Sequence, residues 1–136
     1  MLSNARILIV DDEVANVDLL ESLLLDEGYV NLERACDARE VMDRVAAAPP
    51  DLVLLDLHMP HLDGFELMRR LIASTPADEF LPILVLTADI TPETRQRALA
   101  GGAKDFLTKP IDAVEVGLRI RNLLETRRLH VEQARA

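Results

Sequence analysis

Aromatic residues are scarce in this chain: they make up 3% of its 136 residues, and tryptophan is absent. Hydrophobic residues nevertheless account for 49%, so the composition is not that of a disordered protein. The core must therefore be built from Leu, Ile, Val and Ala, in one domain of ordinary size. The single cysteine, Cys36, excludes an internal disulfide. We expect it to be a small buried or half-buried residue near a strand end.

Long apolar runs and positive charge are also in short supply. No stretch approaches the roughly 18 consecutive apolar residues of a membrane span, and no charged-then-apolar leader opens the sequence. We therefore expect a cytoplasmic protein without membrane contact. The formal net charge of -9 argues against nucleic-acid binding by this domain itself, because binding to phosphate backbones requires a basic surface.

Short aliphatic runs alternate with helical patterns along the whole chain. Aliphatic runs of five or six residues are typical of strands buried on both faces. Alternation with helices predicts parallel strands joined by right-handed crossovers, which is a doubly wound α/β fold. Strands are predicted over 5–10, 30–35, 51–56, 81–87 and 103–107, and helices over 14–27, 37–47, 63–74, 91–100 and from Asp112 onward.

Capping residues mark the ends of these helices. Gly28 follows the first helix as a C-terminal stop, and Asp37 is the expected N-cap of the second. Asp63-Gly64 opens the third helix. Thr91 followed by Pro92 fits a cap with proline at the first helical position, and Gly101-Gly102 closes that helix.

Polar residues follow four of the five aliphatic runs. They are Asp11-Asp12, Asp56, Thr87 and Lys109. Because the carboxyl ends of parallel strands share one edge of the sheet, these side chains should converge on a single crevice. Any one of them alone would more often be a simple helix cap. Their conjunction at four strand ends favours a chemical site.

The residue types in this crevice point to phosphoryl transfer. Adjacent carboxylates are costly unless a cation is present, and an open site of oxygen ligands suits Mg²⁺. Lys109 adds a positive charge and Thr87 a hydroxyl donor. A carboxylate could then attack phosphorus while the surrounding groups neutralise the oxygens.

These residues resemble a known family. The segments that carry the resemblance are Ile9-Val10-Asp11-Asp12-Glu13, Asp56-Leu57-His58-Met59-Pro60 with Asp63-Gly64, Leu86-Thr87-Ala88, and Lys109-Pro110. Together they are similar to the CheY-like receiver domain of two-component response regulators, from residue 5 to about residue 124. The resemblance implies a (βα)5 flavodoxin-like sheet of strand order 2-1-3-4-5.

The resemblance also implies a role for each acidic residue. Asp56 would be the phospho-acceptor, taking its phosphoryl group from a sensor histidine kinase, a phosphotransfer protein or a small donor such as acetyl phosphate. Asp12 and Asp56 would bind Mg²⁺ directly, with the backbone carbonyl of His58 as a third ligand. Asp11 would act through water or orient the other ligands. The protein would catalyse only its own phosphorylation and dephosphorylation, so it would not be an enzyme in the usual sense.

A switch is implied beside this site. Thr87 and Lys109 would contact the phosphoryl oxygens, and Lys109-Pro110 would be joined by a cis peptide bond. Phe106 occupies the position of the switch aromatic, and the small Ala88 would leave the phosphoryl pocket open. Phosphorylation would draw Thr87 inward and let Phe106 fill the vacated space, remodelling the surface of the fourth helix, fifth strand and fifth helix. The alternative for Phe106 is an ordinary core residue.

His58 and Asp89 lie two residues past Asp56 and Thr87, at the expected rim of the pocket. We expect them either to pair across the entrance and limit the access of water, or to be solvated loop residues. Solvated positions are the expectation for His61 and His130, and the loop offers no third soft ligand for a metal site at His58 and His61.

Partner contacts are suggested by four charged residues of the fourth helix, fifth strand and fifth helix. These are Arg95, Asp105, Glu115 and Arg119. Their spacing is similar to that of charges which cross-pair in dimers of transcription-factor receivers. Scattered surface charge, with Glu115 and Arg119 as a plain i, i+4 helix pair, is the alternative.

The last helix is expected to be unusually long and to extend beyond the receiver domain. Residues 1–124 would form that domain, and residues 125–136 would continue the helix as a linker to an output domain, such as a cyclic-di-GMP phosphodiesterase. A complete single-domain regulator is the alternative. Dimerisation through this helix is a further option, because five of its residues fall at coiled-coil spacing: Ile120, Leu124, Arg127, Val131 and Ala134.

An enzyme is the remote alternative. Haloacid-dehalogenase-type phosphatases also place an Asp nucleophile, a Thr and a Lys around Mg²⁺. They require a second Asp two positions after the nucleophile, where this chain has His58. The Asp11-Asp12 pair has no counterpart in that family, so we rank it below the receiver.

Overall fold

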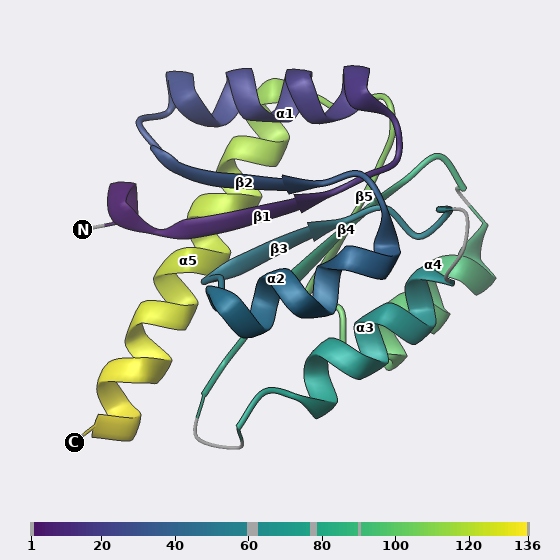
Figure 1. Cartoon of the computed structure of the whole chain (residues 1–136). Coiled ribbons are helices and arrows are strands. Elements are labelled where there is room, and N and C mark those ends of the chain that lie inside the picture. Colours follow the sequence, from purple (N-terminus) through teal and green to yellow (C-terminus); the bar gives the residue numbers. More distant parts are fainter. Residues whose placement is uncertain (1, 60–62, 77–78, 90, 136) are drawn as a thin grey trace.

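A five-stranded parallel sheet forms the centre of the computed structural model, which describes residues 2–59, 63–76, 79–89 and 91–135 (Figure 1). The strand order is β2-β1-β3-β4-β5, as the resemblance to receiver domains implies. Every neighbouring pair is parallel. The described strands are β1 (Arg6–Val10), β2 (Asn31–Ala35), β3 (Leu52–Leu55), β4 (Ile83–Thr87) and β5 (Asp105–Thr108).

The described residues also form five α-helices, one after each strand. They are α1 (Val14–Asp26), α2 (Val41–Ala47), α3 (Gly64–Ala73), α4 (Pro92–Ala100) and α5 (Ala113–Arg135). Two of the predicted N-caps are confirmed by hydrogen bonds. The Asp63 carboxylate accepts from the Phe65 N–H at 2.8 Å, and the Thr91 hydroxyl accepts from the Thr94 N–H at 3.4 Å. Gly28 and Gly102 adopt φ of 96° and 113°, a region that favours glycine.

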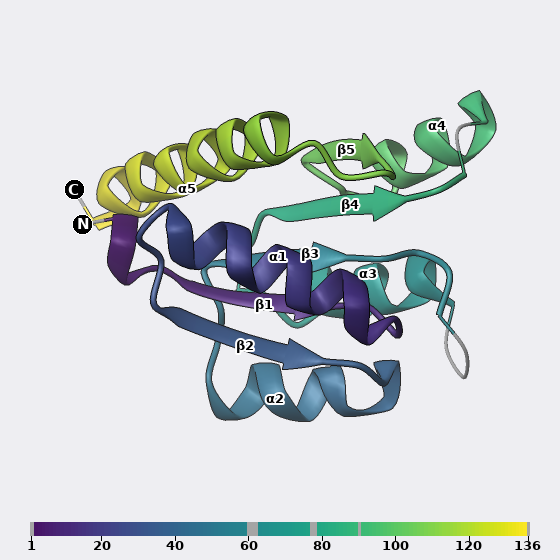
Figure 2. The same ribbon diagram turned by 90° about the horizontal axis from the view of Figure 1, so that it is seen from above.

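Helices cover both faces of the sheet. Helices α1 and α5 pack on one face, and α2, α3 and α4 on the other (Figure 2). Because successive strand residues point to opposite faces, β3 sends Leu52 and Leu54 toward α1 and α5, and Val53 and Leu55 toward the other helices. Both cores are dominated by aliphatic side chains, as the lack of aromatics predicts.

Most elements begin and end within two residues of their predicted bounds, and local contacts explain the differences in two of them. The expected helix over 37–47 is divided into a 3₁₀ turn, Ala38–Glu40, and α2, because Asp37 caps a tight first turn through the Arg39 N–H. Strand β5 begins at Asp105 instead of residue 103. The residues before it are used in leaving α4, where the Ala103 N–H bonds back to the carbonyl of Ala98 at 3.0 Å. Cys36 is half-buried directly after β2, as expected.

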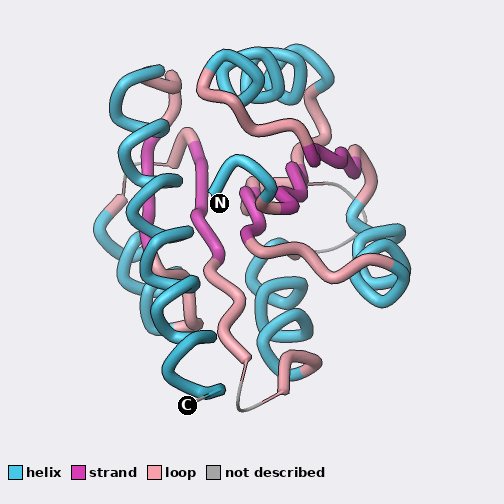
Figure 3. Tube along the Cα trace, turned by 90° about the vertical axis from the view of Figure 1, so that its left-hand side faces the viewer, coloured by secondary structure: helices cyan, strands magenta, loops and turns pink. Residues whose placement is uncertain are grey.

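Helix α5 reaches past the edge of the sheet that holds the amino ends of the strands (Figures 2 and 3). Ile120 and Leu124 are buried in the core. Farther along, Arg127 pairs with Asp51 at 3.0 Å, and the ring of His130 lies 5.2 Å from that of Phe80. These contacts hold the helix extension against the loops before β3 and β4.

A cavity of about 570 Å³ lies between this extension and those loops, and Arg127 and Val131 line it together with Phe80. Most of the stripe at coiled-coil spacing is therefore turned toward its own domain; the side chain of Ala134 lies outside the described residues. Among the described residues, no helix combines the length and apolar character needed to cross a bilayer.

Candidate functional site

Strand register brings the predicted acidic residues together. Val10 of β1 is in register with Leu55 of β3, so the residues that follow, Asp11 and Asp56, lie side by side at the carboxyl edge. The Asp56 N–H donates to the carbonyl of Val10 at 2.9 Å. Carboxylate oxygens of Asp11, Asp12 and Asp56 all lie within 4.8 Å of one another. The convergence expected from the sequence is therefore present.

Lys109 lies between the two buried carboxylates. Its Nζ is 2.9 Å from Asp11 Oδ2 and 3.4 Å from Asp56 Oδ2, and it reaches them from the end of β5. Asp11 is 2% and Asp56 5% exposed, while Asp12 is more accessible at the mouth of the site. The peptide bond between Lys109 and Pro110 is cis, as predicted.

Burial and charge act against each other at these groups. Burial raises the pKa of Asp56, and the Asp11 carboxylate adds to this, although the His58 N–H and the Lys109 ammonium lower it. Burial by itself lowers the pKa of Lys109, but the hydrogen bond to Asp11 and the charges of both carboxylates outweigh it and raise the pKa above its usual value. Lys109 is thus held in its charged form, while Asp56 is costly to ionise without further positive charge.

A close backbone approach fixes the loop that follows Asp56. A Cβ placed on Gly64, the first residue of α3, would lie 2.5 Å from Leu57 Cα, so only glycine fits there. The Gly64 N–H also donates to the Leu57 carbonyl at 3.2 Å. This contact sets where the loop leaves β3. Within the loop, the His58 N–H donates to Asp56 Oδ1 at 3.1 Å.

Thr87 and Phe106 occupy neighbouring strands beside the acidic cluster. Thr87 is fully buried at the end of β4, where its hydroxyl accepts from the Asp89 N–H at 3.2 Å. The Lys109 N–H donates to the Thr87 carbonyl at 2.8 Å, which joins these two elements. Phe106 is half-buried and packs against the core under α3 and α4.

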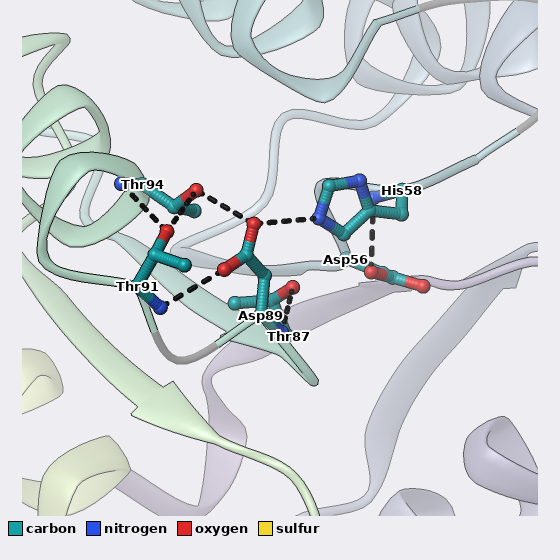
Figure 4. Close-up of polar contacts among 6 residues, drawn as sticks. All are labelled: Asp56, His58, Thr87, Asp89, Thr91 and Thr94. Carbon is teal, nitrogen blue, oxygen red and sulfur yellow. Dashed lines mark hydrogen bonds and ion pairs between the residues drawn. The ribbon is translucent and has the colours of Figure 1, made fainter.

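The two rim residues face each other. His58 Nε2 lies 3.8 Å from Asp89 Oδ2, across the space between the loops after β3 and β4 (Figure 4). The His58 side chain is 59% exposed and that of Asp89 29%. Ala88 is exposed between Thr87 and Asp89. His61 lies outside the described residues.

Comparisons with known proteins identify the family of this chain. The model of the response regulator receiver domain matches residues 7–132. Response regulator PleD of Caulobacter vibrioides is 42% identical over 120 residues, which are 88% of this chain and 26% of PleD. The chain belongs to the response regulator receiver domain family.

Solved structures agree with the receiver fold. Chemotaxis protein CheY4 of Vibrio cholerae is 31% identical with a TM-score of 0.80, covering 88% of this chain and 98% of that one. NtrX of Brucella abortus is 34% identical with a TM-score of 0.87, covering 96% of this chain and 30% of that one. The receiver is thus a signalling module of a two-component system, and the phosphatase alternative is not favoured. The matched part of this chain spans about a quarter of the length of PleD.

The four charged residues suggested for a dimer face are distributed over the receiver's α4, β5 and α5. Arg119 pairs with Asp105 of its own chain at 3.1 Å, rather than with Glu115 four residues before it on the helix. Arg95 and Glu115 are exposed. Two of the four charges are therefore already matched within one copy.

Two side-chain contacts of α4, made by Thr94 and Arg97, were not predicted from the sequence. Thr94 bonds to Asp89, and Arg97 lies 3.9 Å from the ring centre of Phe65 and 4.0 Å from the Asp63 carboxylate. The Thr91-Pro92-Glu93-Thr94 segment carries a signal for the first of these, since a second hydroxyl follows the cap by three residues. The Arg97 contacts join α4 to α3 and leave no trace in local sequence.

Proposed function

We propose that this receiver is a phosphorylation-dependent switch that accepts a phosphoryl group on Asp56 from a sensor histidine kinase or a phosphotransfer protein. Small acyl phosphates such as acetyl phosphate would serve as alternative donors. The observation that carries the proposal is the buried Asp56 carboxylate, with Asp11, Asp12 and Lys109 around it at one sheet edge. No histidine, serine or cysteine is needed as a base, because an ionised carboxylate is itself the nucleophile.

The acidic cluster fits Mg²⁺. Its donors are carboxylate oxygens, and three carboxylates against the Lys109 ammonium leave negative charge that a divalent cation would balance. Asp12 and Asp56 would hold the ion, with the His58 backbone carbonyl as a third ligand and Asp11 orienting the others. Bound Mg²⁺ would neutralise charge on the phosphoryl oxygens.

The chain's own groups would carry the transfer. An Asp56 oxygen attacks phosphorus, the bond from phosphorus to the donor breaks, and the donor leaves with the electron pair of that bond. Lys109 balances the charge on the phosphoryl oxygens, and the Thr87 hydroxyl donates to one of them. Hydrolysis of the acyl phosphate formed on Asp56 would reset the switch. The domain would thus act only on itself.

The signal would pass through Thr87 and Phe106. As Thr87 moves toward the phosphoryl group, space opens beside β4 that the half-buried Phe106 ring can enter. A ring without a hydroxyl would transmit the change by packing alone. The affected surface is that of α4, β5 and α5, which would dimerise through Arg95, Asp105, Glu115 and Arg119.

Residues 125–136 would link the receiver, residues 1–124, to an output domain in a larger response regulator; a single-domain regulator is the alternative. Helix α5 would then carry the signal onward. The extension is also the second surface through which copies of the chain could associate. Its contacts with the loops before β3 and β4 would hold it in a fixed direction.

The test is incubation with Mg²⁺ and acetyl phosphate, followed by intact mass and size-exclusion chromatography. We expect the chain without substitutions and the variant Asp51→Asn each to gain the mass of one phosphoryl group, and Asp56→Asn to gain none. Asp51 is a suitable control because it is an aspartate at the opposite edge of the sheet. An unmodified mass in the presence of Mg²⁺ would refute the proposal. A shift to dimer on modification would support the α4-β5-α5 face.

A further inference from the structure

Asp89 is the centre of a polar network that joins three elements (Figure 4). Its Oδ1 accepts from the Thr91 N–H at 2.9 Å, and its Oδ2 accepts from the Thr94 hydroxyl at 2.7 Å. The same Oδ2 lies 3.8 Å from His58 Nε2. The backbone N–H of Asp89 donates to the Thr87 hydroxyl at 3.2 Å. One residue thus contacts the end of β4, the loop after β3 and the first turn of α4.

The direction of each hydrogen bond in this network is fixed by counting donors. The Thr91 N–H and the Thr94 hydroxyl lower the pKa of Asp89 to about 2, so its carboxylate only accepts. The single Thr94 hydrogen is therefore given to Asp89. The Thr91 hydroxyl, 3.0 Å from that of Thr94, must donate to it in turn. The result is a chain from the Thr91 hydroxyl through Thr94 to Asp89, in which each bond polarises the next.

The other end of the network reaches the Thr87 hydroxyl. A hydroxyl has one hydrogen and two acceptor sites, and the Asp89 N–H occupies one of the acceptor sites. The Thr87 hydrogen therefore points elsewhere and stays available for a phosphoryl oxygen. If Thr87 shifts toward Asp56, Asp89 must follow it or lose the bond. Asp89 can follow only by pulling on Thr91 and Thr94.

A comparison of the two helix starts shows that α4 has more than a simple cap. The N-cap of α3, Asp63, accepts from the Phe65 N–H two residues on, and Asp89 accepts from the Thr91 N–H in the same way. Thr91, however, already caps α4 through the Thr94 N–H. Asp89 and the Thr94 hydroxyl thus form a second tie beyond the cap, and this tie leads back to the pocket.

We propose that Asp89 is a positioning residue that orients the Thr87 hydroxyl and ties it, through Thr94, to the first turn of α4. This inference rests on the proposed phosphoryl site and adds a mechanical link from Thr87 to α4 that does not involve Phe106. His58 completes the link by joining the loop after Asp56 to the same carboxylate.

The experiment follows backbone amide chemical shifts when beryllofluoride, a phosphoryl mimic, is added with Mg²⁺. The matched variants are Thr94→Val, which keeps the shape but removes the hydroxyl, and Thr94→Ser, which keeps the hydroxyl. In the unmodified chain and in Thr94→Ser, amides of α4 should shift on addition. In Thr94→Val the α4 shifts should fall to less than about half, while amides of Glu13 and Leu57 beside the acidic cluster shift fully.

Asp89→Ala gives an independent version of the same test. It removes the carboxylate that accepts from the Thr91 N–H and the Thr94 hydroxyl but keeps the backbone N–H that donates to Thr87, so it should behave as Thr94→Val does. An α4 response in both variants equal to that of Thr94→Ser would overturn the proposal. If the unmodified chain shows no Mg²⁺-dependent response near Glu13 and Leu57, the phosphoryl site itself is refuted, and that result is distinct from loss of the α4 response alone.

Discussion

The amino ends of the parallel strands form one edge of the sheet, the amino edge, and their carboxyl ends form the opposite one, the carboxyl edge. Each holds an ion pair between elements far apart in sequence, but the pairs differ in their balance of charge. At the amino edge, Arg127 of α5 meets Asp51, whose other oxygen accepts from the Arg6 N–H at 2.8 Å. One cation matches one anion. At the carboxyl edge, Lys109 meets Asp11 and Asp56, and Asp12 lies close by.

This difference separates a structural pair from a site with unmet chemical needs. The pair of Arg127 and Asp51 joins a helix to a loop and leaves no net charge. At the carboxyl edge, the described acidic cluster of Asp11, Asp12 and Asp56 sets three carboxylates against the Lys109 ammonium, and two of the three are buried. Like charges in a buried site raise the cost of ionisation. The excess is useful only if a cation or a charged reaction occupies the site at some stage.

Mg²⁺ should therefore stabilise one edge and not the other. At about 100 times its dissociation constant, a bound ion adds about 2.7 kcal/mol to the free energy of unfolding. We expect thermal unfolding, followed by circular dichroism because the chain lacks tryptophan, to show this gain in the unmodified protein and in Asp51→Asn. Asp56→Asn should lose most of it. Equal gains in the two variants would mean that the carboxyl edge has no special demand for a cation.

Glycine substitutions test how each edge is built. Gly64→Ala forces a Cβ against the Leu57 backbone and should cost about 1–3 kcal/mol of stability and slow modification by acetyl phosphate, because it displaces the loop after Asp56. Gly28→Ala is the control: its φ is 96° but nothing lies within 4 Å of the added atom. That variant should cost about 1–2 kcal/mol through backbone strain alone. Chemical denaturation and phosphorylation rates check both. A slowed rate in Gly28→Ala would show that general instability is responsible.

The carboxyl edge could be predicted from sequence and the amino edge could not, for a physical reason. Asp11, Asp56, Thr87 and Lys109 each follow an aliphatic run, so the strand ends themselves reveal where the residues meet. Arg127 lies within a polar helical stretch, and nothing local indicates that it folds back onto a loop 76 positions earlier (127 minus 51).

The helix caps and the parallel strands were equally predictable, because each depends on a local residue type or on alternation, whereas the strand order came from the family resemblance. The link from Asp89 to Thr94 was not predictable, because it requires a turn geometry that brings side chains five residues apart into contact. Gly64 lay in a recognised motif, but the closeness of Leu57, which explains the glycine, is a tertiary property.

The excess of carboxylates at the carboxyl edge also predicts a response to pH in the absence of Mg²⁺. Because burial raises the pKa of Asp56, the folded state favours its protonated form, and stability falls as pH rises from about 4 through that raised pKa. Asp56→Asn should therefore be more stable than the unmodified chain at neutral pH, with the gain vanishing in acid. Asp51→Asn should be less stable at neutral pH, since it loses an ion pair. Urea unfolding between pH 4 and 8 measures both, and a destabilised Asp56→Asn at neutral pH would contradict the argument.

The smallest expected effect concerns the rim of the carboxyl edge. His58 and Asp89 lie between solvent and the site, so replacing both with alanine should let water reach the phosphoryl group more easily and speed its loss. Both side chains are partly exposed, and exposed pairs are weak, so the rate should change by less than about tenfold. The decay of the modified mass after removal of donor gives the rate, with Glu125→Ala plus Arg128→Ala, an exposed pair on the extension of α5, as the control.

His58→Ala alone leaves the bond from Asp89 to Thr94 intact, so an equal change in the single and double variants would assign the effect to the cover over the site. A larger change in the double variant would assign part of it to the tie with α4, and an unchanged rate in both would exclude the rim from control of hydrolysis.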